Sequence, residues 1–378
     1  MSVSCYKKRI SISYWFTIGL LLCCFLNLNA QDIIQKELEQ AQTFIYQKKP
    51  QEAVDLGLAI YEKATDLETR ITALITLVNG YTSLNENDKA MSYAVQAKDI
   101  AKKSGDSHLQ VRTLGLLGEQ YQIYHLNSIS REYLKMAEKL LNDPNLPKEV
   151  VAVSHGNIYA VIGNSYKGQI DCKYAIENYD KAITAYQSVP SHSNAQNNLA
   201  LVYLEKGNCL IEIGDFKNAE INYKKAKNFA SANGLLEYLN FAELGLAKVE
   251  TKRKEFSFSV ARLSALIQDT LSVTPSNVQL QTYTLLKENY KQINDAESYL
   301  LVQQKYVKSL DQINEIEDSN FQQILNFIQN TTFDEKPNTL IRKIIIYMLG
   351  GFLILIILHE IKRQFQSDKQ KNTGKKST

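Results

Sequence analysis

The sequence is poor in the residues that build turns, loops and disulfide-rich scaffolds. It contains six prolines, sixteen glycines and five cysteines in 378 residues. So little proline and glycine excludes a collagen-like or low-complexity chain and favours long helices. So few cysteines exclude a scaffold held together by several disulfides. Only Cys172 and Cys209 lie beyond the first 30 residues. A disulfide between them is permitted outside the cytoplasm, but we expect two free thiols.

The chain also lacks a strong net charge. Its 43 basic residues against 40 acidic ones leave a formal charge of +3, and the excess of basic residues lies at the two ends. The body between them is mildly acidic. Because nucleic-acid binding requires a basic surface that neutralises phosphates, this distribution argues against a nucleic acid as the partner of the body.

Residues 1–30 have the three parts of a secretory signal peptide. Basic residues at 7–9 precede the apolar stretch 10–26, and Ala30 supplies a small residue at a plausible cleavage site. We therefore predict cleavage after Ala30 and export of the residues that follow. An uncleaved membrane anchor is the alternative.

A second apolar stretch lies near the other end of the chain. Residues 344–358 carry no charge, and with their neighbours they predict a transmembrane helix over 339–361. A juxtamembrane helix and linker at 311–338 would precede it, and a short basic cytoplasmic tail at 362–378 would follow. The basic tail places the C-terminus inside. Together with the signal peptide, this predicts a single-span protein of the bacterial inner (cytoplasmic) membrane with its repeats in the periplasm. A buried core helix is the alternative.

Between these segments, residues 31–310 are self-similar. A small residue recurs in one frame at Ala53, Ala90, Ser130, Ala175 and Ala219, between 37 and 45 residues apart. Such self-similarity predicts an all-α solenoid of roughly six or seven stacked helical hairpins. The residues expected to pack the hairpins together are Ala53, Tyr81, Ala90, Gly118, Tyr121, Gly163, Tyr166, Ala175, Tyr179, Ala182, Gly207, Ala219, Tyr223 and Ala226.

The frame resembles the tetratricopeptide repeat (TPR). The TPR first-helix pattern Leu-Gly-x-x-Tyr ends here at Tyr121 and, with Ile for Leu, at Tyr166; the second-helix pattern Ala-x-x-x-aromatic stands at 175–179 and 219–223. The first-helix Trp of the family is absent, and the repeats exceed its length of about 34 residues. The resemblance implies stacked hairpins with longer helices or longer connections.

Four capping boxes mark expected helix starts. They place Thr65, Ser107, Ser193 and Ser276 at N-caps, each with Glu or Gln three residues later. Near the end of the array, residues 306–332 read as an amphipathic helix. It is either a short coiled coil, through which the chain self-associates, or a capping helix of the array.

We find no pattern typical of an enzyme. The five histidines show no metal-ligand spacing, and no nucleophile motif is present. A glycine-bounded stretch at 163–168 resembles the start of a phosphate loop but lacks the Lys-Ser/Thr that such a loop needs. We therefore predict no catalytic residues, no metal and no cofactor.

The best indication of binding is a polar residue that recurs one position after the glycine site of the first helix. The TPR resemblance implies that this position faces a concave groove, where an asparagine can hold a peptide backbone. The alternative is that these residues only belong to the ordinary repeat frame. Arg112 and Lys167 add charge nearby. The predicted groove residues are Asn79, Arg112, Glu119, Asn164, Lys167 and Asn208. We expect replacement of the asparagines to leave stability nearly unchanged.

These observations predict a membrane-anchored extracytoplasmic TPR protein that binds a protein or peptide, as a sensory or regulatory module acting through a separate partner. The arrangement is similar to membrane-anchored repeat regulators of Gram-negative bacteria. It lacks their cytoplasmic output domain, because too few residues follow the span to fold. An envelope assembly scaffold, or the truncated sensor half of a transcriptional regulator, are the alternatives.

Overall fold

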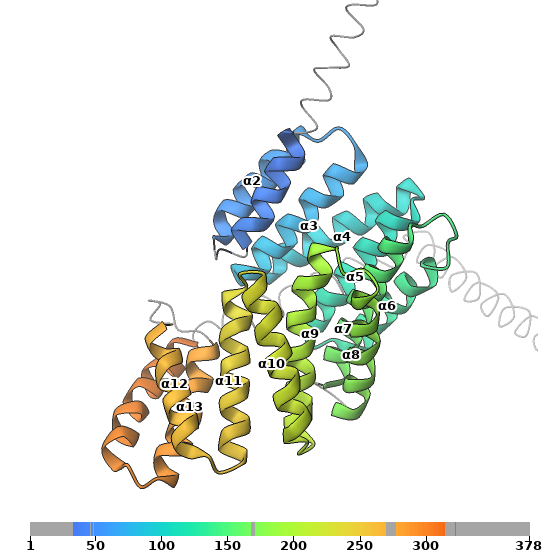
Figure 1. Ribbon diagram of the computed structural model, residues 1–378. Helices are drawn as coiled ribbons and strands as arrows, with labels where there is room; N and C mark the ends of the chain where they lie inside the picture. Colours follow the sequence, from blue (N-terminus) through green and yellow to red (C-terminus); the bar gives the residue numbers. More distant parts are fainter. Residues whose placement is uncertain are drawn as a thin grey trace, which may run out of the picture. The chain divides into compact units, whose positions relative to one another are not determined.

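The computed structural model describes residues 33–45, 47, 49–167, 171–269, 277–313 and 322, and within them it contains helices and turns but no strand. By contacts the chain divides into two units, residues 1–324 and 325–378. All described residues belong to the first unit, where the helices follow one another in chain order (Figure 1).

Successive helices pair into hairpins. Counting residues 33–45 with the helix after them, and residues 296–313 with the helix before them, the described residues form seven hairpins. The helices are α2 (Pro50–Lys63), α3 (Leu67–Ser83), α4 (Asn87–Ser104), α5 (Ser107–Ile123), α6 (Asn127–Leu140), α7 (Lys148–Lys167), α8 (Cys172–Gln187), α9 (Ser193–Glu212), α10 (Phe216–Ala232), α11 (Leu236–Lys252), α12 (Phe256–Asp269) and α13 (Asn277–Gln292). The predicted all-α array of hairpins is confirmed.

The same turn closes most of the hairpins. Its central residue has a positive φ, as at Asn85, His125, Gly214 and Lys254. The next backbone N–H then bonds the carbonyl five residues earlier, for example from Leu126 to Tyr121 at 2.9 Å. This 6→1 bond satisfies a carbonyl that the helix end would otherwise leave unpaired. The bond directs the chain back along the first helix.

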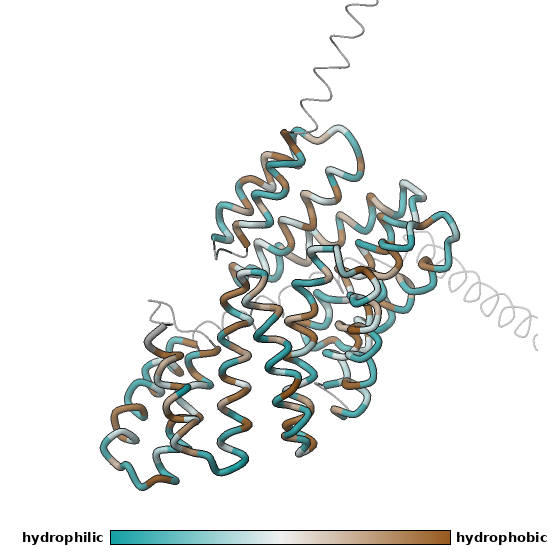
Figure 2. The backbone as a smooth tube through the Cα atoms, viewed as in Figure 1, coloured by the Kyte–Doolittle hydropathy of each residue, from teal (hydrophilic) through white to brown (hydrophobic). Residues whose placement is uncertain are grey.

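The helices stack in two layers. Figure 2 shows apolar and polar residues alternating along each helix, so each buries one stripe. Every helix from α2 to α13 contacts its neighbour in the chain. From α3 to α13 each odd-numbered helix also contacts the next odd-numbered one, whereas no even-numbered helix contacts another even-numbered one. The odd-numbered helices therefore form the inner layer, and we call their exposed surface the inner face.

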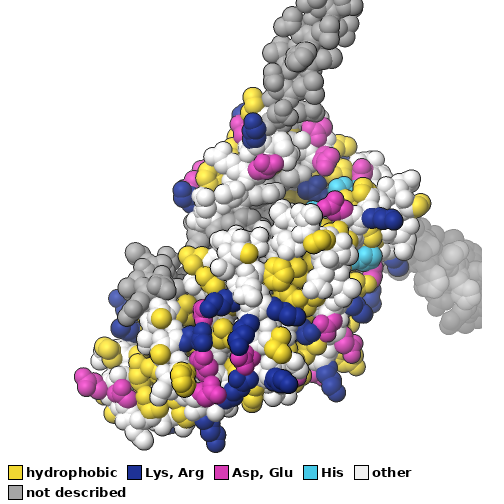
Figure 3. Space-filling view, viewed as in Figure 1, with side chains coloured by type: hydrophobic (Ala, Val, Ile, Leu, Met, Phe, Trp, Pro, Cys, Tyr) yellow, Lys and Arg dark blue, Asp and Glu magenta, His cyan; other side chains and the backbone are white. Residues whose placement is uncertain are grey.

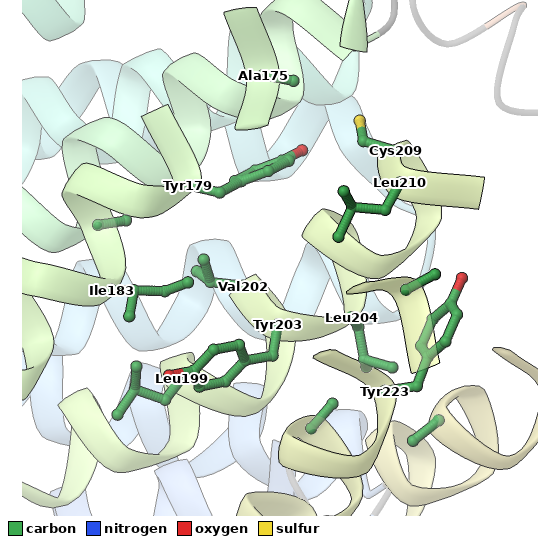
Figure 4. Packing of buried hydrophobic residues seen from close by; sticks show 14 of the residues in the cluster. Ala175, Tyr179, Ile183, Leu199, Val202, Tyr203, Leu204, Cys209, Leu210 and Tyr223 are labelled. Atoms are coloured by element: carbon green, nitrogen blue, oxygen red, sulfur yellow. The ribbon is translucent and has the colours of Figure 1, made fainter. Parts of the chain in front are cut away.

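Tyrosine rings fill the space that glycines leave between helices. A methyl group added at Gly163 would lie 2.5 Å from a ring carbon of Tyr179. The ring of Tyr223 is enclosed from two sides, because added methyl groups would lie 2.8 Å away at Gly207 and 2.3 Å away at Gly245. Both rings are fully buried, and Figure 4 shows them within one core. Glycine lets the helices approach closely enough for each ring to fit.

Other residues of the repeat frame pack differently. Tyr121 stacks on Tyr133 with ring centroids 5.2 Å apart, and Tyr166 lies under the Arg131 guanidinium. Gly118 accommodates the side chain of a leucine rather than a tyrosine. The small residues of the second helices are fully buried; they are Ala53, Ala90, Ser130, Ala175, Ala182, Ala219 and Ala226.

Buried polar groups join one hairpin to the next. Thr251 of α11 donates its hydroxyl to the Asn289 Oδ1 of α13 at 3.0 Å, and Asn289 Nδ2 donates to Ser259 Oγ of α12 at 2.8 Å. Because a buried polar group without a partner is costly, this network favours one register between the hairpins. Cys172 and Cys209 are buried free thiols.

The helix starts correct the sequence prediction. The N-caps of α3 and α5 are Asp66 and Asp106, whose carboxylates accept from backbone N–H groups at 2.8 and 3.0 Å. Thr65 and Ser107 were therefore wrong by one residue, because a carboxylate also gains from the positive end of the helix dipole. Ser193 lies inside α9, whose N-cap makes no side-chain hydrogen bond. The remaining predicted cap, Ser276, lies outside the described residues.

The predicted inner-membrane localisation is wrong and is corrected here. In the part of the chain that the structure describes, no helix is both long enough and apolar enough to cross a bilayer. Even the two 20-residue helices, α7 and α9, carry polar and charged residues along their length, as amphipathic helices of a repeat array do. The predicted signal peptide 1–30, transmembrane helix 339–361 and tail 362–378 lie outside the described residues. So does nearly all of 311–338.

Two helical glycines give a matched test of this packing. Replacing Gly163 with Ala should lower the thermal midpoint of the full chain, because overpacking against Tyr179 costs about 1–3 kcal/mol and exceeds the gain in helix propensity. Gly115 of α5 has no atom within 4 Å of an added methyl group. Gly115→Ala should raise the midpoint. Circular dichroism melts would measure both, and an unchanged or raised midpoint for Gly163→Ala would refute the contact.

Candidate functional site

The inner face contains a pocket of about 470 Å³ between α7, α9, α11 and α13, and Tyr223 of α10 reaches it from behind. Four different hairpins therefore contribute to one cavity. Its apolar lining consists of leucine, isoleucine and aromatic side chains, namely Leu201, Leu204, Ile211, Tyr223, Tyr238, Phe241 and Leu244. A concave, mostly apolar cavity with a few polar groups is the usual form of a ligand site.

An ion pair lies on one side of this pocket. Lys167 of α7 contacts Glu205 of α9 at 2.6 Å, and both side chains are about a quarter exposed. Burial acts to lower the pKa of Lys167, but the carboxylate of Glu205 outweighs it, so the pKa lies above its usual value. The charge that Lys167 presents is therefore already neutralised by the protein.

A second lysine faces the same cavity without such a partner. Lys248 of α11 donates to the neutral Gln281 of α13 at 2.8 Å. It makes no ion pair with any residue that the structure describes. Burial lowers its pKa, the nearby Lys167 lowers it further, and Glu205 and Glu212 only partly offset this. The ammonium of Lys248 is thus poorly stabilised in the absence of a ligand.

The predicted asparagines are held by the buried tyrosines. Tyr179 and Tyr223 donate their hydroxyls to Oδ1 of Asn164 and Asn208, each at 2.8 Å. In both cases the glycine before the asparagine admits the ring, and the asparagine accepts the hydroxyl. The amide N–H₂ groups of these two asparagines donate to no described residue. Each asparagine is therefore oriented through its oxygen, while its N–H₂ group has no acceptor among the described residues.

This arrangement corrects one expectation. Replacing Asn164 or Asn208 with Ala would leave a tyrosine hydroxyl without its acceptor, and an unsatisfied buried donor costs about 1–3 kcal/mol. Stability would therefore fall, contrary to our sequence-based prediction. The two asparagines therefore have a packing role, and their role in a groove stays a prediction.

The remaining predicted groove residues do not line the pocket. Asn79 lies exposed on α3. Arg112 of α5 donates to Thr72 Oγ1 at 3.0 Å, and burial lowers its pKa. Glu119 is accessible to solvent, yet protein surrounds its carboxyl closely enough that desolvation raises its pKa. Of the predicted set, only Lys167 and Asn208 line the cavity. A ligand role for all six residues stays a prediction.

Sequence reasoning missed Lys248, although a signal for it exists. Ser130 Oγ donates to the Gly118 carbonyl at 2.6 Å, and Ser259 Oγ donates to the Ala247 carbonyl at 3.0 Å, each across 12 residues. These matching bonds make Ala247 the equivalent of Gly118 in the repeat. The residue after Ala247, which is Lys248, is therefore the equivalent of Glu119. The equivalent residues on α3, α5, α7, α9 and α11, which we call the inner-face line, are Asn79, Glu119, Asn164, Asn208 and Lys248.

The described surface carries no dominant charge of one sign. Figure 3 shows basic, acidic and apolar side chains intermixed on the face that it displays. Within the described residues, no group of three or more His, Cys, Asp or Glu side chains is placed to hold a metal ion. The polar side chains that line the pocket can form hydrogen bonds and ion pairs; they are Lys167, Glu205, Asn208, Glu212, Lys248 and Gln281.

Solved structures of similar fold are helical-repeat proteins. NprR in complex with its cognate peptide NprX is 11% identical, with a TM-score of 0.51 over 82% of this chain and 92% of that one. A signal-transduction ATPase with a tetratricopeptide repeat sensor from Pyrococcus horikoshii is 13% identical, with a TM-score of 0.50 over 77% and 44%. The APC/C hetero-tetramer Cut9–Hcn1 is 14% identical, with a TM-score of 0.50 over 68% of this chain and 42% of that one.

No family model matches the chain, and no curated protein matches it. At such low identity the structural likenesses establish the fold alone. Together with the hairpin stack, they show that this chain has a TPR-type fold.

The buried tyrosines predict alkaline unfolding. Burial raises the pKa of Tyr179, Tyr186 and Tyr223, whereas an unfolded tyrosine titrates near pH 10. Below about pH 10 both states are neutral; above it the unfolded chain loses protons first, so stability falls as the pH rises. Phenolate absorbance of buried tyrosines should appear together with loss of helical circular dichroism. Ionisation of all tyrosines in a chain that keeps its helical circular dichroism would contradict this expectation.

Proposed function

We propose that this chain is a binding module that holds a peptide, or a peptide segment of a protein partner, along its inner face. Its sensory or regulatory effect would pass through that separate partner. The observation that carries the proposal is the pair Asn164 and Asn208, whose amide oxygens are fixed by tyrosines while their N–H₂ groups remain available. Asn208 also lines the pocket.

An extended peptide needs hydrogen-bond donors and apolar area on the surface that binds it. Its backbone carbonyls lose their bonds to water on binding, so they need donors from the protein. Amides that are already oriented provide such donors with little further loss of side-chain entropy. The apolar side chains around Asn208, such as Leu204 and Phe241, supply the area that a ligand side chain would bury.

The ligand class receives support from one structure of similar fold. NprR was solved with its cognate peptide. Because a likeness in fold does not carry a ligand from one protein to another, we bring the peptide class to this chain as part of the proposal. An assembly scaffold, the alternative from the sequence, would need no such cavity or available amides.

The test removes the N–H₂ donors of the two asparagines and keeps a side-chain oxygen as the acceptor for each tyrosine hydroxyl. Asn164→Asp and Asn208→Asp retain an oxygen for the tyrosine hydroxyl but lose the N–H₂ group. The full chain would be incubated with a pool of randomised hexapeptides with free ends, and retained peptides would be identified by mass spectrometry. Affinities of the retained peptides for each variant would be measured by calorimetry. Each substitution should weaken binding roughly 2- to 12-fold, which corresponds to one neutral hydrogen bond.

The matched control is Asn228→Asp, which adds the same charge at an exposed position of α10. It should leave affinity unchanged. Retention of no hexapeptide by the wild-type chain would overturn the proposal. Equal affinity of the wild-type and both groove variants would also overturn it, because the amides would then contribute no donor.

A further inference from the structure

The inner-face line carries its two charges at different helices. Glu119 lies on α5 and Lys248 on α11, and the positions between them are the amides of Asn164 and Asn208. Read from α5 to α11, the line is therefore acidic, neutral, neutral and basic. Since all four residues occupy the same position of successive hairpins, this order is a property of one continuous layer of helices.

Neither charge has a counter-ion among the residues that the structure describes. Glu119 makes no hydrogen bond and no ion pair there. Lys248 bonds only the neutral Gln281, and it forms no ion pair with the two acids that line the same pocket. Glu205 is paired with Lys167, whereas Glu212 accepts a bond from the Cys172 thiol at 3.0 Å and keeps its negative charge. Lys248 is partly removed from water at the pocket, and a charge in that position without a partner is stabilised by an ion of opposite sign. Glu119 is exposed and has no counter-ion, so it is open to a cation of a ligand.

A buried hydroxyl joins the helices that lie between the two charges. It belongs to Tyr186 of α8. This hydroxyl donates to Asn157 Oδ1 at 2.7 Å and accepts from Asn198 Nδ2 at 3.2 Å. Tyr186 therefore connects α8 to α7 and α9, the inner-face helices between Glu119 and Lys248.

We propose that the inner face binds a zwitterionic peptide in one direction, with a cationic group of the ligand beside Glu119 and a carboxylate of the ligand beside Lys248. This inference rests on the proposed function and deepens it. The ligand cation is its N-terminal amine or a Lys or Arg side chain, and the ligand carboxylate is its C-terminus or an Asp or Glu side chain.

The direction follows from repulsion as well as attraction. A peptide bound the other way would place its carboxylate beside Glu119 and its cation beside Lys248, and like charges in contact disfavour such a complex. The ion pair of Lys167 with Glu205 presents no net charge to either orientation. Glu288 of α13 occupies the next equivalent position after Lys248, and it makes no ion pair with Lys248.

The experiment uses a pool of randomised decapeptides, because ten extended residues span about 33 Å and can reach across the three helix steps from α5 to α11. It compares four forms of this pool: free at both ends, N-acetylated, C-amidated, and blocked at both ends. Each pool would be offered to the full-length wild-type chain, Glu119→Gln and Lys248→Met, and affinities of recovered peptides would be measured. Loss of one charge-assisted contact should weaken binding about 10-fold or more. Amidation of a peptide should weaken its binding to the wild type. It should not weaken binding to Lys248→Met any further, because that variant already lacks the charge that the carboxylate would contact. Acetylation should weaken binding to the wild type but not further to Glu119→Gln.

The two sources of each charge are separated by the blocked pools. Retention of amidated peptides rich in Asp or Glu, still dependent on Lys248, would support the proposal with a side-chain carboxylate. Likewise, retention of acetylated peptides rich in Lys or Arg, still dependent on Glu119, would support the proposal with a side-chain cation. The matched controls are Lys217→Met on α10 and Glu177→Gln on α8, both exposed and outside the pocket lining, which should bind all pools as the wild type does.

The failures are distinguishable. If the wild type retains peptides with equal affinity from all four pools and regardless of their charged side chains, this inference is overturned while the proposed function stands. Unchanged affinity in both Glu119→Gln and Lys248→Met would overturn it in the same way. Retention of no peptide at all would overturn both. Thermal melts of each variant would show that a loss of binding is not a loss of folding.

Discussion

The contact between a glycine and a tyrosine ring is the constraint on which the described array depends. At Gly163 and Gly207 the missing side chain lets the rings of Tyr179 and Tyr223 lie against the first helix of their own hairpins. The contact sets how closely the helices approach, and it also carries each hydroxyl to the inner face, where an asparagine accepts it. At Asn208 the ring that fills the core therefore also orients an amide that lines the pocket.

The hairpin stack was predictable because its cause is local and repeated. Small residues such as Ala175 and Ala219 recur in the sequence wherever a second helix must approach a first, so the frame can be read without knowing any long-range contact. Helix starts were predicted less well. At α3 and α5 two capping residues stand side by side, and sequence spacing does not say which one accepts; the carboxylates of Asp66 and Asp106 do.

The candidate site was only partly predictable, since it forms between hairpins. Spacing placed Asn164 and Asn208 at equivalent positions, but it did not reveal that tyrosines hold them; the equal separation of 15 residues to their partners was a usable signal. Lys248 was missed because Ser259 replaces the expected alanine and Ala247 the expected glycine. No spacing rule brings Lys167, Lys248 and residues of three further helices to one cavity, because that depends on how successive hairpins stack.

The position of Tyr223 between two glycines has a consequence for how the array holds together. Its ring belongs as much to the hairpin that contains Gly245 as to its own, so removing the later hairpin would uncover a fully buried aromatic side chain. The two hairpins, α9–α10 and α11–α12, should therefore unfold as one cooperative unit rather than as separate repeats. A shortened chain that is meant to fold independently should end after both of them or before both of them.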